Sequence, residues 1–136
     1  MDRQTRIDLI KLWLEKAHDD LATAEDNLRL NHTRGVVNRS YYAIFHAASA
    51  VLLWHGEERA KHSGVQATFG ERFIAAGIFE PELGRIYTRA RREREEIDYK
   101  PASPTPTAEQ ASTRLDESRR FVARVERYLR EVGALE

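Results

Sequence analysis

The segment from Arg34 to Trp54 constrains the fold more than any other part of the sequence. Its apolar residues recur at every third or fourth position, which is the period of one face of an α-helix, and many flanking positions are apolar as well. The main face consists of Val37, Tyr41, Ile44, Ala48, Val51 and Leu52. A helix that is apolar on most sides has to be covered by other elements. We therefore predict a central, buried helix.

Four further segments have the helical period. The pattern predicts helices at 5–30, at 63 to about 76, at 81 to about 98, and at 107–133. Their ends carry typical signals. Ser63 with Gln66, and Thr107 with Gln110, have the spacing of a capping box, in which each side chain pairs with a free backbone amide. Pro81 suits a first helical turn, and Gly133 suits a helix end.

The segment from Lys100 to Thr107 holds three of the four prolines and is predicted to be a loop, because proline lacks a backbone N–H and disfavours helix in the residue before it. No segment alternates between apolar and polar residues with period two, as a half-buried strand would. The sequence therefore predicts an all-α, antiparallel bundle of about five helices. We expect one domain over residues 1–136, with the proline-rich loop 100–107 inside it.

The composition excludes several kinds of chemistry. The 136 residues include 22 basic and 22 acidic side chains and no cysteine. Without cysteine there are no disulfides, thiolate metal sites or thiol nucleophiles. With balanced charge, a nucleic acid has to be held by a local site. The residues 1–10 lack the apolar core of a secretory signal, and the apolar stretch 43–54 is shorter than the roughly 20 residues that span a bilayer. We expect a cytoplasmic protein with no membrane partner.

Arg39 and His46 place a permanent cation and an imidazole in the most apolar helix. Seven residues separate them, so they lie within about 20° of one line along the helix and about 10.5 Å apart along its axis. A neutral imidazole can accept the proton of an RNA 2′-hydroxyl, and a guanidinium can bind two phosphoryl oxygens of the transition state. The pair is thus sufficient for cleavage of RNA to a 2′,3′-cyclic phosphate and a 5′-hydroxyl. We expect no metal or other cofactor.

The axial offset makes it hard for one Arg39 and one His46 to act on the same phosphate, and it leaves a second proton donor unassigned. A homodimer formed through this helix would bring two copies of each residue into one cleft. Asn38, Ser40 and Tyr42 are candidates for residues that position the pair. The alternative is that Arg39 and His46 only stabilise the core or a subunit contact.

Three blocks of the sequence carry a resemblance. They are Asn38 to Ala47, Lys61 to Val65 and Arg94 to Tyr99. Together they resemble the HEPN domain family of prokaryotes, over about residues 8–130. The resemblance implies a helical bundle that dimerises and is often encoded beside a minimal nucleotidyltransferase, as a toxin with its antitoxin. It also implies that an Arg-x(4 to 6)-His motif at the dimer interface, here Arg39 and His46, cleaves RNA without metal.

The resemblance leaves two points open. Some family members have a tyrosine two residues after the motif histidine, where the antitoxin attaches nucleotides, but this sequence has Ala48 there. Regulation of that kind would need Tyr41, Tyr42 or Tyr99 instead. Other members serve as nucleotide- or polynucleotide-binding modules for a nucleotidyltransferase. That role is the alternative to a ribonuclease, and a purely structural dimer is a third.

Several other residues have weaker functional signals. The segment from Arg85 to Arg94 contains five arginines, and two of them, Arg89 and Arg92, are predicted to contact RNA phosphates. The alternative is a solvated helix face whose positive charge is neutralised by Glu95, Glu96 and the first helix.

Tyr99 is expected to be a buried phenol that, with Asp98, caps the central helix or orients His46. Glu15 and His18 match half of a di-iron motif, which has no second copy here. Trp13, Trp54 and Phe69 are expected to be core or interface anchors.

Overall fold

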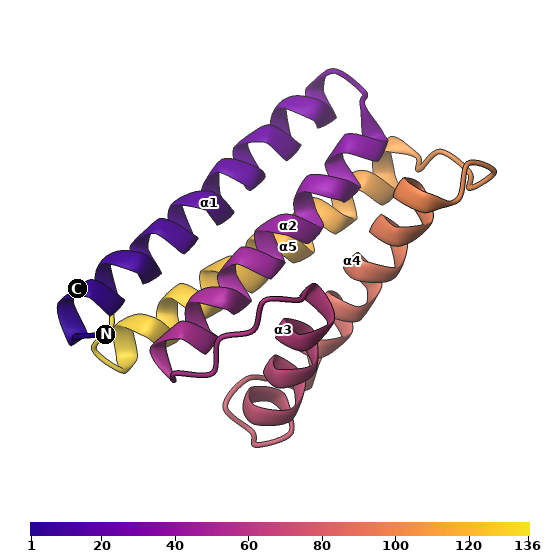
Figure 1. Cartoon of the computed structure of the whole chain (residues 1–136). Coiled ribbons are helices and arrows are strands. Elements are labelled where there is room, and N and C mark those ends of the chain that lie inside the picture. Colours follow the sequence, from indigo (N-terminus) through magenta and orange to yellow (C-terminus); the bar gives the residue numbers. More distant parts are fainter.

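The computed structural model describes all residues, 1–136, and contains five α-helices and no strand (Figure 1). The helices are α1 (Arg3–Arg29), α2 (Thr33–Trp54), α3 (His62–Phe69), α4 (Pro81–Tyr99) and α5 (Ala108–Glu131). A π-helical turn, η1 (Gly70–Ile74), continues α3. The all-α bundle of about five helices is confirmed, and the predicted helices match these elements to within a few residues except after α3.

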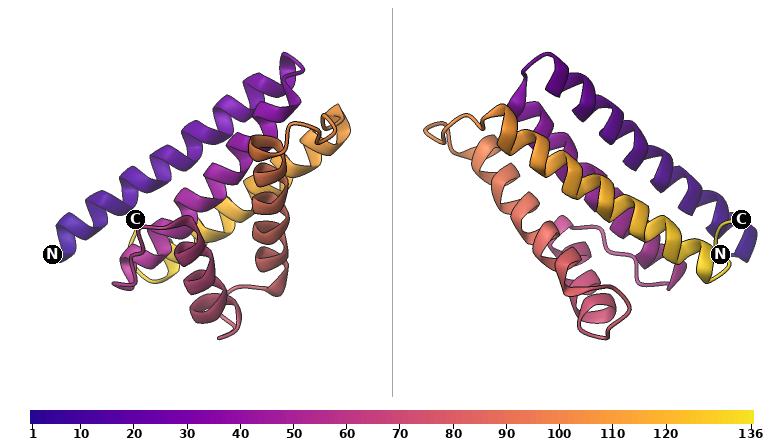
Figure 2. Two further views of the ribbon diagram at one scale, coloured as in Figure 1. Left: turned by 45° about the vertical axis from the view of Figure 1, so that its right-hand side comes forward. Right: turned by 180° about the vertical axis from the view of Figure 1, so that it is seen from behind.

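The helix α2 is the centre of the bundle, as predicted. It packs against α1, α3, α4 and α5, and 15 of its 22 residues are buried. Figure 2 shows α5 lying along the back of α2, with α1 on one side and α4 on the other. Its apolar face joins a core of 27 residues that includes Ile10 of α1, Phe69 of α3, Tyr87 of α4 and Phe121 of α5. Burial of these side chains from four neighbouring helices stabilises the fold.

Two pairs of helices that follow one another in the chain, α1 with α2 and α4 with α5, run in opposite directions. The helix α2 returns along α1, and α5 returns along α4 (Figure 1). The two central helices, α2 and α5, run in the same direction. The helices α1 and α5 run in opposite directions, since His18 of α1 contacts Glu126 and Glu25 pairs with Arg119. The turn between α1 and α2 is tight: Asn31 has a left-handed φ of 59°. A Cβ added at Gly35 would lie 2.7 Å from Nδ2 of Asn27, so glycine lets the two helices approach closely there.

The predicted helix ends are confirmed at α5 and wrong at α3. The side chain of Thr107 accepts from the Gln110 amide, and the Gln110 side chain accepts from the Thr107 amide, which completes the capping box. The helix α3 instead begins at His62 with Lys61 as its N-cap, so Ser63 already lies inside the first turn and cannot cap it. Gly77 and Gly133 both have φ near 82° and follow the helical segments, as predicted.

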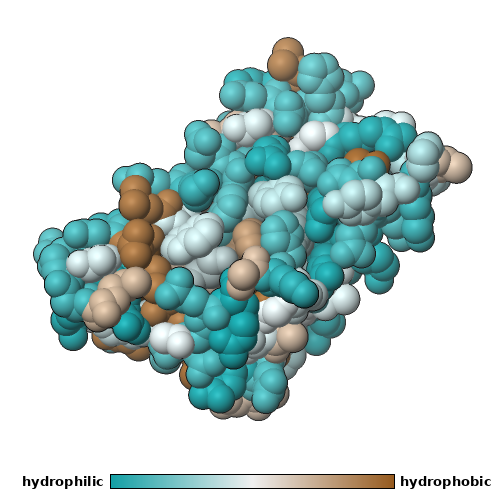
Figure 3. Space-filling view, in the orientation of Figure 1, coloured by the Kyte–Doolittle hydropathy of each residue, from teal (hydrophilic) through white to brown (hydrophobic).

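The surface is mostly hydrophilic on the side seen in Figure 3, with an apolar strip over the N-terminal half of α1. Leu12, on this part of α1, is 53% exposed. The proline-rich loop is attached to the bundle, because Arg34 donates to the Ser103 carbonyl and the Thr105 hydroxyl, each at 3.1 Å. None of the helices combines the length and apolar character that crossing a membrane requires.

The capping box gives a test of how α5 is held. Replacing Thr107 with alanine should lower the free energy of unfolding by about 1 kcal/mol, because the Gln110 amide loses its acceptor. Urea unfolding followed by circular dichroism measures the change. The control is Thr23→Ala, at an exposed position inside α1, which should change stability by less than about 0.5 kcal/mol. Equal effects of the two substitutions would contradict the capping role.

Candidate active site

The predicted pair, Arg39 and His46, is joined by a carboxylate from the neighbouring helix. Arg39 Nη1 donates to Asp20 Oδ1 at 3.1 Å, and His46 Nδ1 lies 2.6 Å from Asp20 Oδ2. The Asp20 side chain is 8% exposed, so α1 presents a buried negative charge to the polar face of α2. Burying a carboxylate is costly unless it is paired. Asp20 therefore holds both side chains in fixed positions.

The carboxylate also determines which nitrogen of His46 is free. An ionised carboxylate can only accept, so Nδ1 of His46 carries the proton and donates to Asp20. The other nitrogen, Nε2, makes no hydrogen bond within the chain and is not among the buried unpaired atoms, so it reaches the surface. The His46 side chain is 14% exposed and that of Arg39 is 34% exposed. Both side chains are therefore partly exposed to solvent while Asp20 binds them on their buried side.

Aromatic rings fix the remaining sides of the pair. The Trp13 ring stacks on His46 with 5.5 Å between centroids and 28° between planes. The Arg39 guanidinium lies over the Tyr42 ring, 4.6 Å from its centroid, in cation–π geometry. A pocket of about 200 Å³ opens beside these rings and is lined by Trp13, Phe45, Ser49, Leu52, Glu58, Arg59, Ala60 and Val65. Trp13 is half-buried and thus packs on the site, while Phe69 lies in the core as predicted.

The axial offset between Arg39 and His46 predicts that one chain can hardly bring both to one phosphate, and the structure shows that both side chains meet at one carboxylate of α1. Both reach the same carboxylate, at its two oxygens. The two residues are separated along the axis of α2. Asp20 projects from α1 between them, and the long side chain of Arg39 spans the distance to the carboxylate. A single chain therefore brings the cation and the imidazole together.

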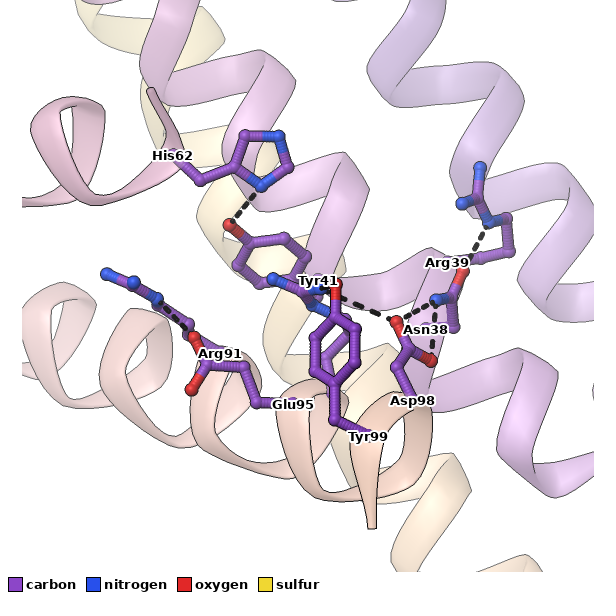
Figure 4. A network of polar contacts seen from close by, with 9 residues as sticks. Asn38, Arg39, Tyr41, His62, Arg91, Glu95, Asp98 and Tyr99 are labelled. Carbon is purple, nitrogen blue, oxygen red and sulfur yellow. Dashed lines mark hydrogen bonds and ion pairs between the residues drawn. The ribbon is translucent and has the colours of Figure 1, made fainter. Parts of the chain in front are cut away.

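Residues of the three sequence blocks come together on the side of α2 next to Arg39, as Figure 4 shows for Asn38, His62 and Asp98. Asn38 accepts from Arg39 Nε at 2.9 Å and donates to the Asp98 carboxylate of α4. The same carboxylate accepts from Arg94 at 3.4 Å. Arg94 is 5% exposed and lies 4.6 Å from the centroid of the Tyr41 ring. Asn38 therefore contacts Arg39 directly and links α2 to α4.

The second block enters through His62, at the start of α3. Its Nδ1 lies 3.2 Å from the Tyr41 hydroxyl, and its ring lies 4.1 Å from that of Phe45. Burial lowers the pKa of His62, and the positive charges of Arg94 and Arg91 lower it further. Burial raises the pKa of Tyr41, against the opposing charges of Arg94 and Arg91, so Tyr41 remains a neutral phenol.

Two candidate residues do not lie where the sequence predicted. Ser40 is buried against α5, where its carbonyl accepts a hydrogen bond from the Ser118 hydroxyl. Successive residues of a helix differ by about 100° in direction, so the Ser40 side chain points away from that of Arg39. Tyr99 is 71% exposed and not a buried phenol. Its hydroxyl accepts from Arg94 at 3.4 Å, and it makes no contact with His46. The end of α4 leaves Tyr99 at the surface beside the loop.

The arginines of α4 divide into paired and unpaired groups. Arg89 pairs with Glu117 of α5, Arg91 with Glu95, and Arg94 with Asp98. The partners come from α5 and α4, so the predicted neutralisation by the first helix is wrong. Arg85 and Arg92 are exposed and make no ion pair. They line, with Arg89 and Thr88, a hollow of about 450 Å³ that has no apolar residue.

The residues of the half di-iron motif do not form a cluster. His18 contacts the Glu126 carboxylate of α5 and thereby links two helices. No group of three or more potential metal-ligating side chains occurs in the chain.

A substitution at Asp20 tests whether the carboxylate organises the pair. Asp20→Asn should lower the free energy of unfolding by about 1 to 3 kcal/mol, because Arg39 and His46 lose a buried, charged acceptor. Chemical unfolding at pH 7 measures it. Asp19→Asn, at an exposed position without a partner, is the matched control and should change little. Equal stability of the two variants would show that Asp20 contributes nothing.

Comparison with known proteins identifies the family. The HEPN domain model matches residues 10–128. A protein of Methanocaldococcus jannaschii named "Putative toxin" is 36% identical over 123 residues, which is 90% of each chain. A second protein of that name and organism is 30% identical over 129 residues, which is 95% of this chain and 86% of its own. A "UPF0332 protein" of Thermotoga maritima is 38% identical over 91 residues, 67% of this chain and 69% of its own. The chain therefore belongs to the HEPN domain family, as its three sequence blocks predicted.

Proposed function

We propose that this protein is a metal-independent endoribonuclease of the toxin type. The observation that carries the proposal is the pair of accessible groups, Arg39 and Nε2 of His46, held on one buried carboxylate. A permanent cation beside an imidazole with a free nitrogen is suited to phosphodiester cleavage. The similarity to two proteins named as toxins supports a toxic activity, and the family resemblance supports RNA as its substrate.

Each residue has a defined part in the reaction. Nε2 of His46 takes the proton of the 2′-hydroxyl, and Asp20 stabilises the imidazolium that forms. The Arg39 Nη2 group makes no hydrogen bond to Asp20 or Asn38 and is free to bind phosphoryl oxygens. Asn38 and Tyr42 hold the guanidinium from its other sides. The products are a 2′,3′-cyclic phosphate and a 5′-hydroxyl.

The assembly belongs to the proposal. We place two copies of the chain about a two-fold axis, with α2 near the interface, so that two sites face one cleft. The apolar strip around Leu12 and the half-buried Trp13 supply the kind of surface that such a contact covers. A minimal nucleotidyltransferase is the expected antitoxin partner. The absence of a tyrosine at position 48 means that an attached nucleotide would have to be placed on another residue.

Cleavage of random-sequence oligoribonucleotides in excess EDTA tests the activity. His46→Ala and Arg39→Ala should each lower the rate by about 10² to 10⁴-fold, with the cyclic phosphate as the wild-type product. The matched control is His18→Ala, on the α1–α5 side of the molecule, which should cleave like wild type. Sedimentation and circular dichroism show whether dimer and fold are intact.

The outcomes separate the three functions. Loss of the product in both variants, with an intact dimer, supports the ribonuclease. Equal background cleavage by all proteins overturns it and favours a nucleotide-binding module that serves a nucleotidyltransferase. If both variants are monomeric or unfolded, Arg39 and His46 have a structural role.

The hollow on α4 yields a separate prediction about RNA binding. Arg92→Gln should weaken RNA binding equally for different sequences and reduce the slope of log affinity against log salt by about 1, because one phosphate contact is lost. Fluorescence anisotropy at several salt concentrations measures both effects. Arg127→Gln, on an exposed part of α5, is the control. An unchanged salt slope in Arg92→Gln would exclude α4 from the RNA path.

A further inference from the structure

Two imidazoles face the same pair of aromatic rings. The His46 and His62 rings lie 5.4 Å and 4.1 Å from the Phe45 centroid. They lie 6.1 Å and 5.6 Å from the Tyr42 centroid. His62 is also close enough to His46 to respond to its charge. The two histidines come from different helices, so the fold and not the local sequence brings them together.

The two imidazoles have opposite surroundings. His46 lies on the Asp20 carboxylate, which stabilises a positive charge on its ring. The charged and titratable groups around His62 are Arg91 and Arg94 of α4, Tyr41, Tyr42 and His46 of α2, and the adjacent Lys61. None of these is a carboxylate, and burial together with the positive charges of Arg94 and Arg91 lowers the pKa of His62, so it gives up a proton more readily than a solvated imidazole does. Two groups whose surroundings differ in this way can divide the acid and base steps of one reaction.

The Tyr41 hydroxyl fixes the orientation of the His62 ring. It bonds to Nδ1 at 3.2 Å, which directs Nε2 to the other side of the ring. The His62 residue is half-buried, so it keeps access to the surface. Its Nε2 forms no hydrogen bond within the chain.

We infer that His62 is a second catalytic residue of this site, the general acid that protonates the leaving 5′-oxygen of the RNA. This inference rests on the proposed ribonuclease function. It places the second proton donor in the same chain as His46. The copies of Arg39 and His46 that a two-fold symmetric dimer would supply are then not needed for this proton transfer.

The proton transfers balance over the step. His46 Nε2 accepts the 2′-hydroxyl proton while the 2′-oxygen forms its bond to phosphorus. The bond from phosphorus to the 5′-oxygen breaks, its electron pair stays on that oxygen, and the proton of His62 Nε2 joins it. Solvent then takes the proton from His46 and returns one to His62.

A substrate that needs no acid tests the assignment. Sulfur in place of the bridging 5′-oxygen leaves as a thiolate without protonation. His62→Ala should lower cleavage of the oxygen substrate by about 10² to 10⁴-fold and that of the sulfur substrate by less than about 10-fold. His46→Ala should impair both substrates. His32→Ala, an exposed histidine before α2 without a side-chain bond, is the control and should cleave both normally.

The pH dependence of the wild-type protein gives a readout that needs no variant. Because His62 must be protonated to donate and its pKa is lowered, the rate on the oxygen substrate should fall as pH rises through a value below that of a free imidazole. The sulfur substrate should lack this fall. His62→Gln, checked by thermal unfolding, guards against a folding defect in His62→Ala.

Three outcomes overturn the inference. These are equal losses on both substrates in folded His62 variants, no loss on either, or the same descending pH limb for both substrates. Failure of the ribonuclease proposal looks different, because the wild type and His46→Ala would then cleave neither substrate above background.

Discussion

The contact on which the site depends is the buried carboxylate of Asp20, shared by Arg39 and His46. It resolves a problem that the sequence raises, namely a cation and an imidazole on the most apolar helix. Without a partner, these groups would be costly to hold near the core. With it, Arg39 is fixed and His46 has a defined tautomer with Nε2 directed outward. The same charge that stabilises α1 against α2 thus fixes the two groups that the proposed reaction uses.

The fold explains why three distant blocks of the sequence act together. The helix α2 is covered on nearly all sides, and its remaining face receives Asp20 from α1, His62 from α3 and Asp98 from α4. The side chain of Arg94 is almost fully buried and lies against Tyr41, which in turn bonds to His62. Changes in α3 or α4 can therefore alter the positions of groups near Arg39, although they are far apart in the chain.

Most of the fold and part of the site could be predicted from the sequence. Five helices can be predicted from the helical spacing of apolar residues and from the signals at helix ends, because the spacing indicates which face of each helix is buried. Arg39 and His46 could be found because polar residues interrupt an apolar helix. Asp20 was missed, although it lies three residues after Ala17 and four before Ala24, on the buried face of α1. The bond of His62 to Tyr41 depends on how α3 returns to α2, which no local pattern records. The burial expected for Tyr99 failed because the end of α4 faces solvent.

The tautomer of His46 is the most direct test of this account. Long-range ¹H–¹⁵N NMR spectra of the histidine side chains, recorded at a pH at which the imidazoles are neutral, distinguish a protonated Nδ1 from a protonated Nε2. The account predicts a protonated Nδ1 and an unprotonated Nε2 in the wild type, and loss of this preference in Asp20→Asn. A protonated Nε2 in the wild type, or spectra that are the same in both proteins, would contradict it.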